Sequence, residues 1–82
     1  MTEIEEVAQI LFDNNDGVRR AAALAKHADA ANNQDGLSLA LRRAKDCVYA
    51  AMDWEDHGGR HTAYCVAVEV QCLILDSLSG LK

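Results

Sequence analysis

The chain has 82 residues, of which 13 are acidic and 8 basic, so its formal net charge is −5, and it contains no proline. A negative net charge opposes binding to the phosphates of nucleic acids, and three cysteines without framework spacing argue against a disulfide-stabilised scaffold. One domain of this length buries only roughly 60–65% of its unfolded surface, so a core built from a single copy is marginal.

Alanine is abundant, which favours helix, and clusters of Asn, Asp and Gly divide the chain into four segments. The acidic start of the chain lacks the positive region of a signal peptide, and no uninterrupted apolar run approaches the ~20 residues that span a bilayer. We therefore expect a cytoplasmic protein that makes no contact with membranes. The predicted helices cover residues 3–12, 18–31, 37–54 and 60–78 of a single domain, 1–82.

In the first segment, Thr2 and Glu5 have the spacing of a capping box. Apolar residues then recur at helical spacing: Ile4, Val7, Ala8 and Leu11. The turn-forming residues 13–17 end this pattern. The first segment therefore reads as a short amphipathic helix.

The second segment places mainly small residues on one face: Val18, Ala21, Leu24, Ala25 and Ala28. We expect a neighbouring helix to approach this face closely. His27 stands beside it and reads as a surface or interface residue. Residues 32–36 end the segment.

The third segment, for which Asp35 is the candidate N-cap, carries a longer amphipathic stripe: Leu37, Ala40, Leu41, Ala44, Cys47, Val48, Ala51 and Met52. Three large residues lie outside it: Leu39, Tyr49 and Trp54. These are either isolated surface residues, which are common, or part of a second interface, where Tyr and Trp are favoured.

The fourth segment is apolar from Ala63 to Leu75 except at Glu69 and Gln71. Alternating residues from Tyr64 to Ile74 also fit a strand, but no other segment offers a strand partner, so we predict a helix. A helix that is apolar on nearly every side must be buried between several neighbours or against a second copy. We predict an antiparallel hairpin of the third and fourth helices, completed by homodimerisation through Val66, Val70, Leu73 and Ile74.

A resemblance supports the hairpin. The residues Leu41 and Ala44, then 50–53, 60–64 and 73–78, resemble a family of short helical-hairpin proteins of unknown function from pseudomonads and related bacteria. The resemblance covers residues 37–81 and consists mostly of alanines and leucines; the density of Val and Cys in the fourth segment departs from it. It implies a bacterial or phage origin, but it carries no activity and no site residues.

One side-chain stripe has the composition of a metal site. His61, Cys65 and Glu69 are four residues apart, and Cys72 and Asp76 continue nearly the same line. These side chains bind zinc, but the paired spacings of structural zinc sites are absent. We therefore predict that the stripe packs as ordinary helix surface, with no metal and no cofactor bound.

Two charged clusters are candidates for a catalytic site and a nucleic-acid-binding site. The turn between the last two segments carries Asp53, Glu55, Asp56, His57, Arg60 and His61, a mixture suited to acid–base catalysis but equally to a solvated helix connection. The basic residues Arg19, Arg20, Arg42, Arg43 and Lys45 resemble phosphate contacts, but acidic neighbours dilute their charge. We predict neither an enzyme nor direct binding of nucleic acid.

The sequence thus predicts an all-α bundle that acts as a non-enzymatic interaction or regulatory module, with a second copy and an unidentified protein as partners. The alternative is a small acidic inhibitor of the kind that phages use against host nucleic-acid-handling or defence complexes (anti-CRISPR-like). Its acidic side chains would occupy a basic groove of the target. The contact residues would be Glu3, Glu5, Glu6, Asp53, Glu55 and Asp56.

Overall fold

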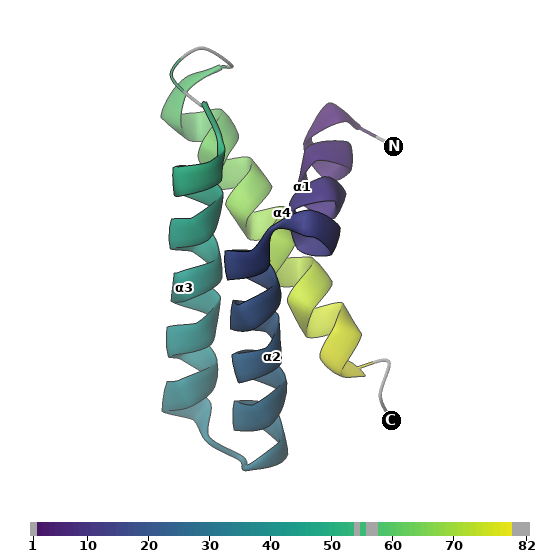
Figure 1. The fold of residues 1–82 in the computed structure, drawn as a ribbon, viewed down its shortest axis with the longest axis vertical. Coiled ribbons are helices and arrows are strands. Elements are labelled where there is room, and N and C mark those ends of the chain that lie inside the picture. The colour runs from purple at the N-terminus through teal and green to yellow at the C-terminus, as the bar shows by residue number, and fades with distance from the viewer. Residues whose placement is uncertain (1, 54, 56–57, 80–82) are drawn as a thin grey trace.

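The computed structural model describes residues 2–53, 55 and 58–79. It is a small all-α bundle of four helices, α1 (Glu3–Asn14), α2 (Asp16–Ala30), α3 (Gln34–Ala51) and α4 (Gly59–Ser79) (Figure 1). The described residues include no strand, so the all-α prediction is confirmed and the strand interpretation of residues 64–74 is wrong. Trp54, Asp56 and His57 lie outside the described residues.

Asparagine caps set the helix starts, and they correct the predicted bounds of two helices. Asn15 accepts a hydrogen bond from the Val18 amide (3.0 Å), and Asn33 accepts one from the Gly36 amide (2.9 Å). The second and third helices therefore begin two and three residues earlier than predicted, and the cap of α3 is Asn33 rather than Asp35. Thr2 caps α1 as expected, by accepting from the Glu5 amide at 3.2 Å.

The other end of α3 also differs from the prediction. The helix ends at Ala51, three residues before the predicted 54, because Met52 adopts an extended conformation with a ψ of 138°. Gly58, directly before α4, and Gly59, the first residue of α4, then take positive φ angles of 106° and 79°. Glycine adopts such angles without a steric penalty, which explains the glycine pair at this position.

We expect Asn15→Ala to lower the free energy of unfolding by about 0.5–2 kcal/mol, because it removes the side-chain acceptor for the Val18 amide. Asn14→Ala is the matched control. The Asn14 side chain is exposed and only donates to the Ile10 carbonyl within α1, so its loss should cost less than about 0.5 kcal/mol. Urea denaturation at one fixed protein concentration measures both values. Equal losses for the two variants would contradict a capping role for Asn15.

The helices α2 and α3 form an antiparallel pair joined by residues 31–33, and α4 crosses the pair while contacting α1 and α3 (Figure 1). The α2–α3 contact is built from small buried side chains: Ala21, Ala25, Ala28, Ala40 and Ala44. A Cβ atom added at Gly17 would lie 2.6 Å from the Cys47 Sγ atom, so the two helices approach closely near the start of α2. The predicted close approach to α2 is confirmed.

The larger core side chains come mainly from α4. Val66, Val70 and Ile74 are almost completely buried, together with Val18 of α2 and Val48 of α3. The Gln71 amide of α4 also donates a hydrogen bond to the Leu41 carbonyl of α3 at 3.0 Å. Because the core joins all four helices, it fixes which face of α4 points inward and which points outward.

Candidate interaction surfaces

The outward face of α4 carries an exposed apolar stripe, which we call the α4 stripe. Its large members are Tyr64, Val68 and Leu75, which are 52%, 37% and 41% exposed, and Cys72 lies exposed between them. The stripe runs over the 12 residues from Tyr64 to Leu75, a distance of about 16 Å along the helix. An ordered row of exposed apolar side chains on one helix marks an interaction surface more specifically than scattered ones.

The predicted dimer contacts do not lie on this surface. Val66, Val70 and Ile74 are at most 1% exposed within the single chain, and Leu73 is half-buried. These side chains pack in the chain's own core, because α1 and α3 together cover one whole side of α4. They are therefore not available to a second copy. An apolar contact between α4 and another molecule would have to use the α4 stripe instead.

The metal-like stripe is only partly assembled. The Cys65 Sγ atom lies 3.6 Å from the His61 Nε2 atom, whereas Glu69 forms no hydrogen bond with either of these two residues. Within the part of the chain that the structure describes, no three His, Cys, Asp or Glu side chains come together as a metal site would require. That the stripe binds no metal remains a prediction, and elemental analysis of the purified protein tests it.

The acidic residues of the alternative hypothesis gather at one end of the molecule. Glu3, Glu5 and Glu6 lie in the first turn of α1, and this end also contains the connection between α3 and α4, with exposed Asp53 and Glu55 (Figure 1). A cleft of about 450 Å³ lies at this end. The cleft is lined by Glu3, Ile4, Val7, Met52, Thr62 and Val66. The structure brings these acidic residues to one end, while Asp56 lies outside the described residues.

The same connection gives no support to the catalytic interpretation. Among its described members, Asp53, Glu55 and Arg60 are exposed and form no ion pair with one another. Among the described residues, His61 has its side-chain interaction with Cys65. The described part of the connection therefore shows no acid–base pair held in a desolvated pocket, which general acid–base catalysis needs.

A third surface, the α2–α3 groove, runs between these two helices. Leu24 of α2 and Leu39 of α3 are 45% and 48% exposed beside it, and Arg20, His27 and Arg43 line it. The sequence pattern had placed Leu24 on the buried face of its helix, and that placement is wrong. Alanines at the α2–α3 contact bring the helix axes so close that no space remains for a leucine between them.

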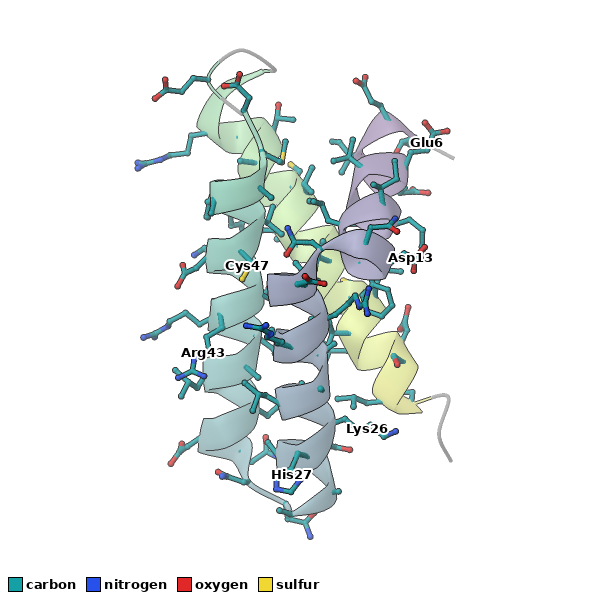
Figure 2. The ribbon with its side chains drawn as sticks, viewed as in Figure 1. Glu6, Asp13, Lys26, His27, Arg43 and Cys47 are labelled. Carbon is teal, nitrogen blue, oxygen red and sulfur yellow. The ribbon has the colours of Figure 1, made fainter. Side chains whose placement is uncertain are left out.

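Charged side chains lie on several sides of the molecule. Figure 2 shows Glu6 and Asp13 on the α1 side and Arg43 on the α3 side. Of the basic residues that the sequence singled out, Arg19 lies 4.0 Å from Asp16 and the Lys45 Nζ atom lies 5.9 Å from the Tyr49 ring centroid. Neither Arg20 nor Arg43 makes an ion pair with any residue that the structure describes.

By length and mean hydropathy alone, α4 also has the properties of a membrane span: it has 21 residues, and an 18-residue window within it has a mean hydropathy of 1.3. The nearly apolar run from Ala63 to Leu75 is shorter than this window, so it did not predict a span. Central helices of soluble bundles have the same properties, and Val66, Val70 and Ile74 of α4 are buried in the chain's own core. This single helix is therefore weak evidence for a membrane contact.

Comparisons with known proteins identify no relative of this chain. No protein-family model, no curated protein and no solved structure matches this chain.

Proposed function

We propose that the chain is a small non-enzymatic interaction module of the cytoplasm that acts as a homodimer. The observation that carries the proposal is the α4 stripe, in which Tyr64, Val68 and Leu75 leave large apolar areas exposed. In the dimer, α4 of each copy would pack against α4 of the other through this stripe. Burial of these side chains would stabilise the dimer by a free energy of roughly 25 cal/mol per Å² of apolar surface removed from water.

The charges of α4 favour an antiparallel pairing of the two stripes. Arg60 and His61 lie in its first turn, whereas Glu69 lies at its middle and Asp76 near its end. A two-fold axis near the middle of the stripe would bring Arg60 of each copy toward Asp76 of the other, so that opposite charges meet at both ends. A parallel pairing would instead place like charges together.

We expect sedimentation equilibrium at about 100 μM chain to give twice the 8.9 kDa chain mass, since an interface of this length supports a dissociation constant on the order of micromolar. Val68→Asp should raise that constant roughly 100-fold, because a carboxylate would be buried without a partner. Ala23→Asp, an equal change of charge on the exposed side of α2, should leave it unchanged.

Charge exchange tests the orientation of the dimer. Asp76→Arg should weaken it, and adding Arg60→Asp should restore it if the pairing is antiparallel. A folded monomer whose melting temperature does not depend on concentration would overturn the dimer proposal. So would flotation of the wild-type chain with lipid vesicles that Val68→Asp abolishes, since the stripe would then face lipid.

The acidic end supports a second candidate function. Its observation is that Glu3, Glu5 and Glu6 lie at the same end of the molecule as exposed Asp53 and Glu55, with Glu3 lining the cleft of about 450 Å³ (Figure 1). Exposed carboxylates beside an apolar cleft suit a basic groove of a nucleic-acid-handling complex, which they would occupy in place of phosphates.

A phage-targeting assay in bacteria that carry a defence complex tests this candidate. Expression of the chain should protect the phage, and the triple change Glu3→Gln, Glu5→Gln and Glu6→Gln should remove the protection. Asp29→Asn, which changes an exposed carboxylate of α2, is the control that keeps it. Full protection by the triple variant would exclude the acidic end as the contact.

A further inference from the structure

The α2–α3 groove consists of two neighbouring hollows along the surface of the helix pair. One part, of about 270 Å³, is lined in part by Leu24, His27, Leu39 and Arg43, and the other, of about 330 Å³, by Arg20, Leu24 and Arg43 among others. Leu24 and Arg43 line both parts, so the two hollows adjoin at these residues. The lining runs from Gly17 of α2 to Ala31, directly after this helix, which corresponds to about 21 Å or nearly four helical turns.

Small residues form the floor of this groove, and large apolar residues form its sides. The floor residues are Gly17, Ala21, Ala28, Gly36 and Ala40. Leu24 and Leu39 remain about half exposed beside them, although scattered exposed leucines need no explanation. Here the two leucines line the same hollow from opposite helices, which gives a shape that a third helix fits.

The charges of the groove identify the chemistry of its occupant. The guanidinium groups of Arg20 and Arg43 line it and form no ion pair with any residue in the described ranges. Asp46 is the acidic side chain among the described residues that line either part. Two unpaired guanidinium groups beside exposed leucines are complementary to carboxylates that flank an apolar face, because arginine binds carboxylates in a planar, bidentate geometry.

We propose that the α2–α3 groove docks an acidic amphipathic helix of another protein, whose apolar side chains cover Leu24 and Leu39 and whose carboxylates pair with Arg20 and Arg43. This proposal is independent of the α4 stripe, with which the groove shares no residue. A nucleic acid fits the groove less well, since phosphates gain nothing from the two leucines, and both Asp46 and the net charge of −5 repel them.

A second copy of the chain is the nearest competitor for the groove. The α1 helix exposes Ile10 between Glu6 and Asp13, which is the same acidic and apolar chemistry on a smaller scale. A contact between α1 of one copy and the groove of the next would be heterologous and would build rings or open chains rather than a closed two-fold dimer. The size of the assembly therefore distinguishes a second copy of the chain from an acidic helix of another protein as the occupant of the groove.

The experiment is a titration of the full-length chain with a designed helical peptide. Calorimetry measures the affinity, and changes in amide chemical shifts locate the binding site. The peptide carries leucines at helical spacing on one face and glutamates on both flanks. We expect saturable binding with the shifts confined to α2 and α3. A matched peptide with lysines in place of glutamates should not bind, and one with alanines in place of leucines should bind roughly tenfold more weakly.

Variants of the protein locate the site. Arg43→Glu and Arg20→Glu should each weaken peptide binding roughly tenfold or more, because each loses a charge-assisted contact and gains a repulsive one. Lys26→Glu is the matched control, since Lys26 is exposed on α2 but lines neither part of the groove, and it should leave the affinity unchanged.

Three results would each overturn the proposal. The first is the absence of saturable binding by the acidic peptide. The second is binding of an oligonucleotide, but not of the peptide, that Arg43→Glu abolishes. The third is growth of the wild-type chain into assemblies larger than a dimer that Ile10→Asp and Arg43→Glu both abolish, since the occupant would then be a second copy.

Discussion

Ile74→Asp should leave the protein unfolded at 25 °C. Ile74 is 1% exposed and belongs to the core that joins all four helices. The change removes roughly 1.5–3 kcal/mol of apolar burial and places a carboxyl group where it has no hydrogen-bond partner, at a further cost of several kcal/mol. A domain of this length has a free energy of unfolding of roughly 4–12 kcal/mol. The loss caused by the substitution is therefore comparable to the total stability of the protein. Far-UV circular dichroism measures it directly.

The neighbouring residue supplies the matched control for this prediction. Leu75 is 41% exposed on the opposite side of α4, so Leu75→Asp places the same charge in water and should keep the helical signal. It should nevertheless dissociate the proposed dimer, because Leu75 belongs to the α4 stripe. If Ile74→Asp retains cooperative unfolding, or if Leu75→Asp unfolds the chain as completely, the assignment of inner and outer faces of α4 is wrong.

Ala25→Leu should produce the second large effect. Ala25 is fully buried where α2 packs against α3, in a contact built largely from alanines. A leucine there has no cavity to fill, so the helices must move apart, and we expect a loss of about 3 kcal/mol or more in the free energy of unfolding. Chemical denaturation at a fixed protein concentration gives the value.

Ala23→Leu is the matched control, two residues earlier on the same helix. Ala23 is exposed, so the larger side chain extends into water and should change the free energy of unfolding by less than about 0.5 kcal/mol. If the two leucine variants are equally stable, α2 and α3 do not approach as closely as the buried alanines indicate. The double change Ala25→Leu with Ala44→Gly should recover part of the loss only if these two residues share one layer of the contact.

Much of the helical architecture follows from local patterns in the sequence. Turn-forming clusters at residues 13–17 and 32–36 separate the helices, and Thr2 caps α1 at the predicted position. The errors of two and three residues at the starts of α2 and α3 have one cause. Asn15 and Asn33 cap the helices from inside these clusters, so that Asp and Gly residues that favour turns become the first helical turn.

The sequence also predicted that α2 presents small side chains to a neighbouring helix, but it misplaced Leu24. On a helical wheel Leu24 lies on the same face as Ala21 and Ala28. The distance between the axes of α2 and α3 decides whether a leucine fits there, and that distance is set by alanines on both helices. Because Arg20 and Arg43 come from different helices, only the packed pair brings them to the same groove.

The sequence by itself determined four helices, their approximate ends, the close approach to α2 and the excess of apolar residues on α4. It did not determine which side of α4 lies inside. Val66, Val70 and Ile74 form one apolar stripe of this helix, and Tyr64, Val68 and Leu75 form another, so the hydrophobic pattern gives no direction. Only the tertiary structure distinguishes the stripes, because α1 and α3 together cover one side of α4 and leave the other exposed.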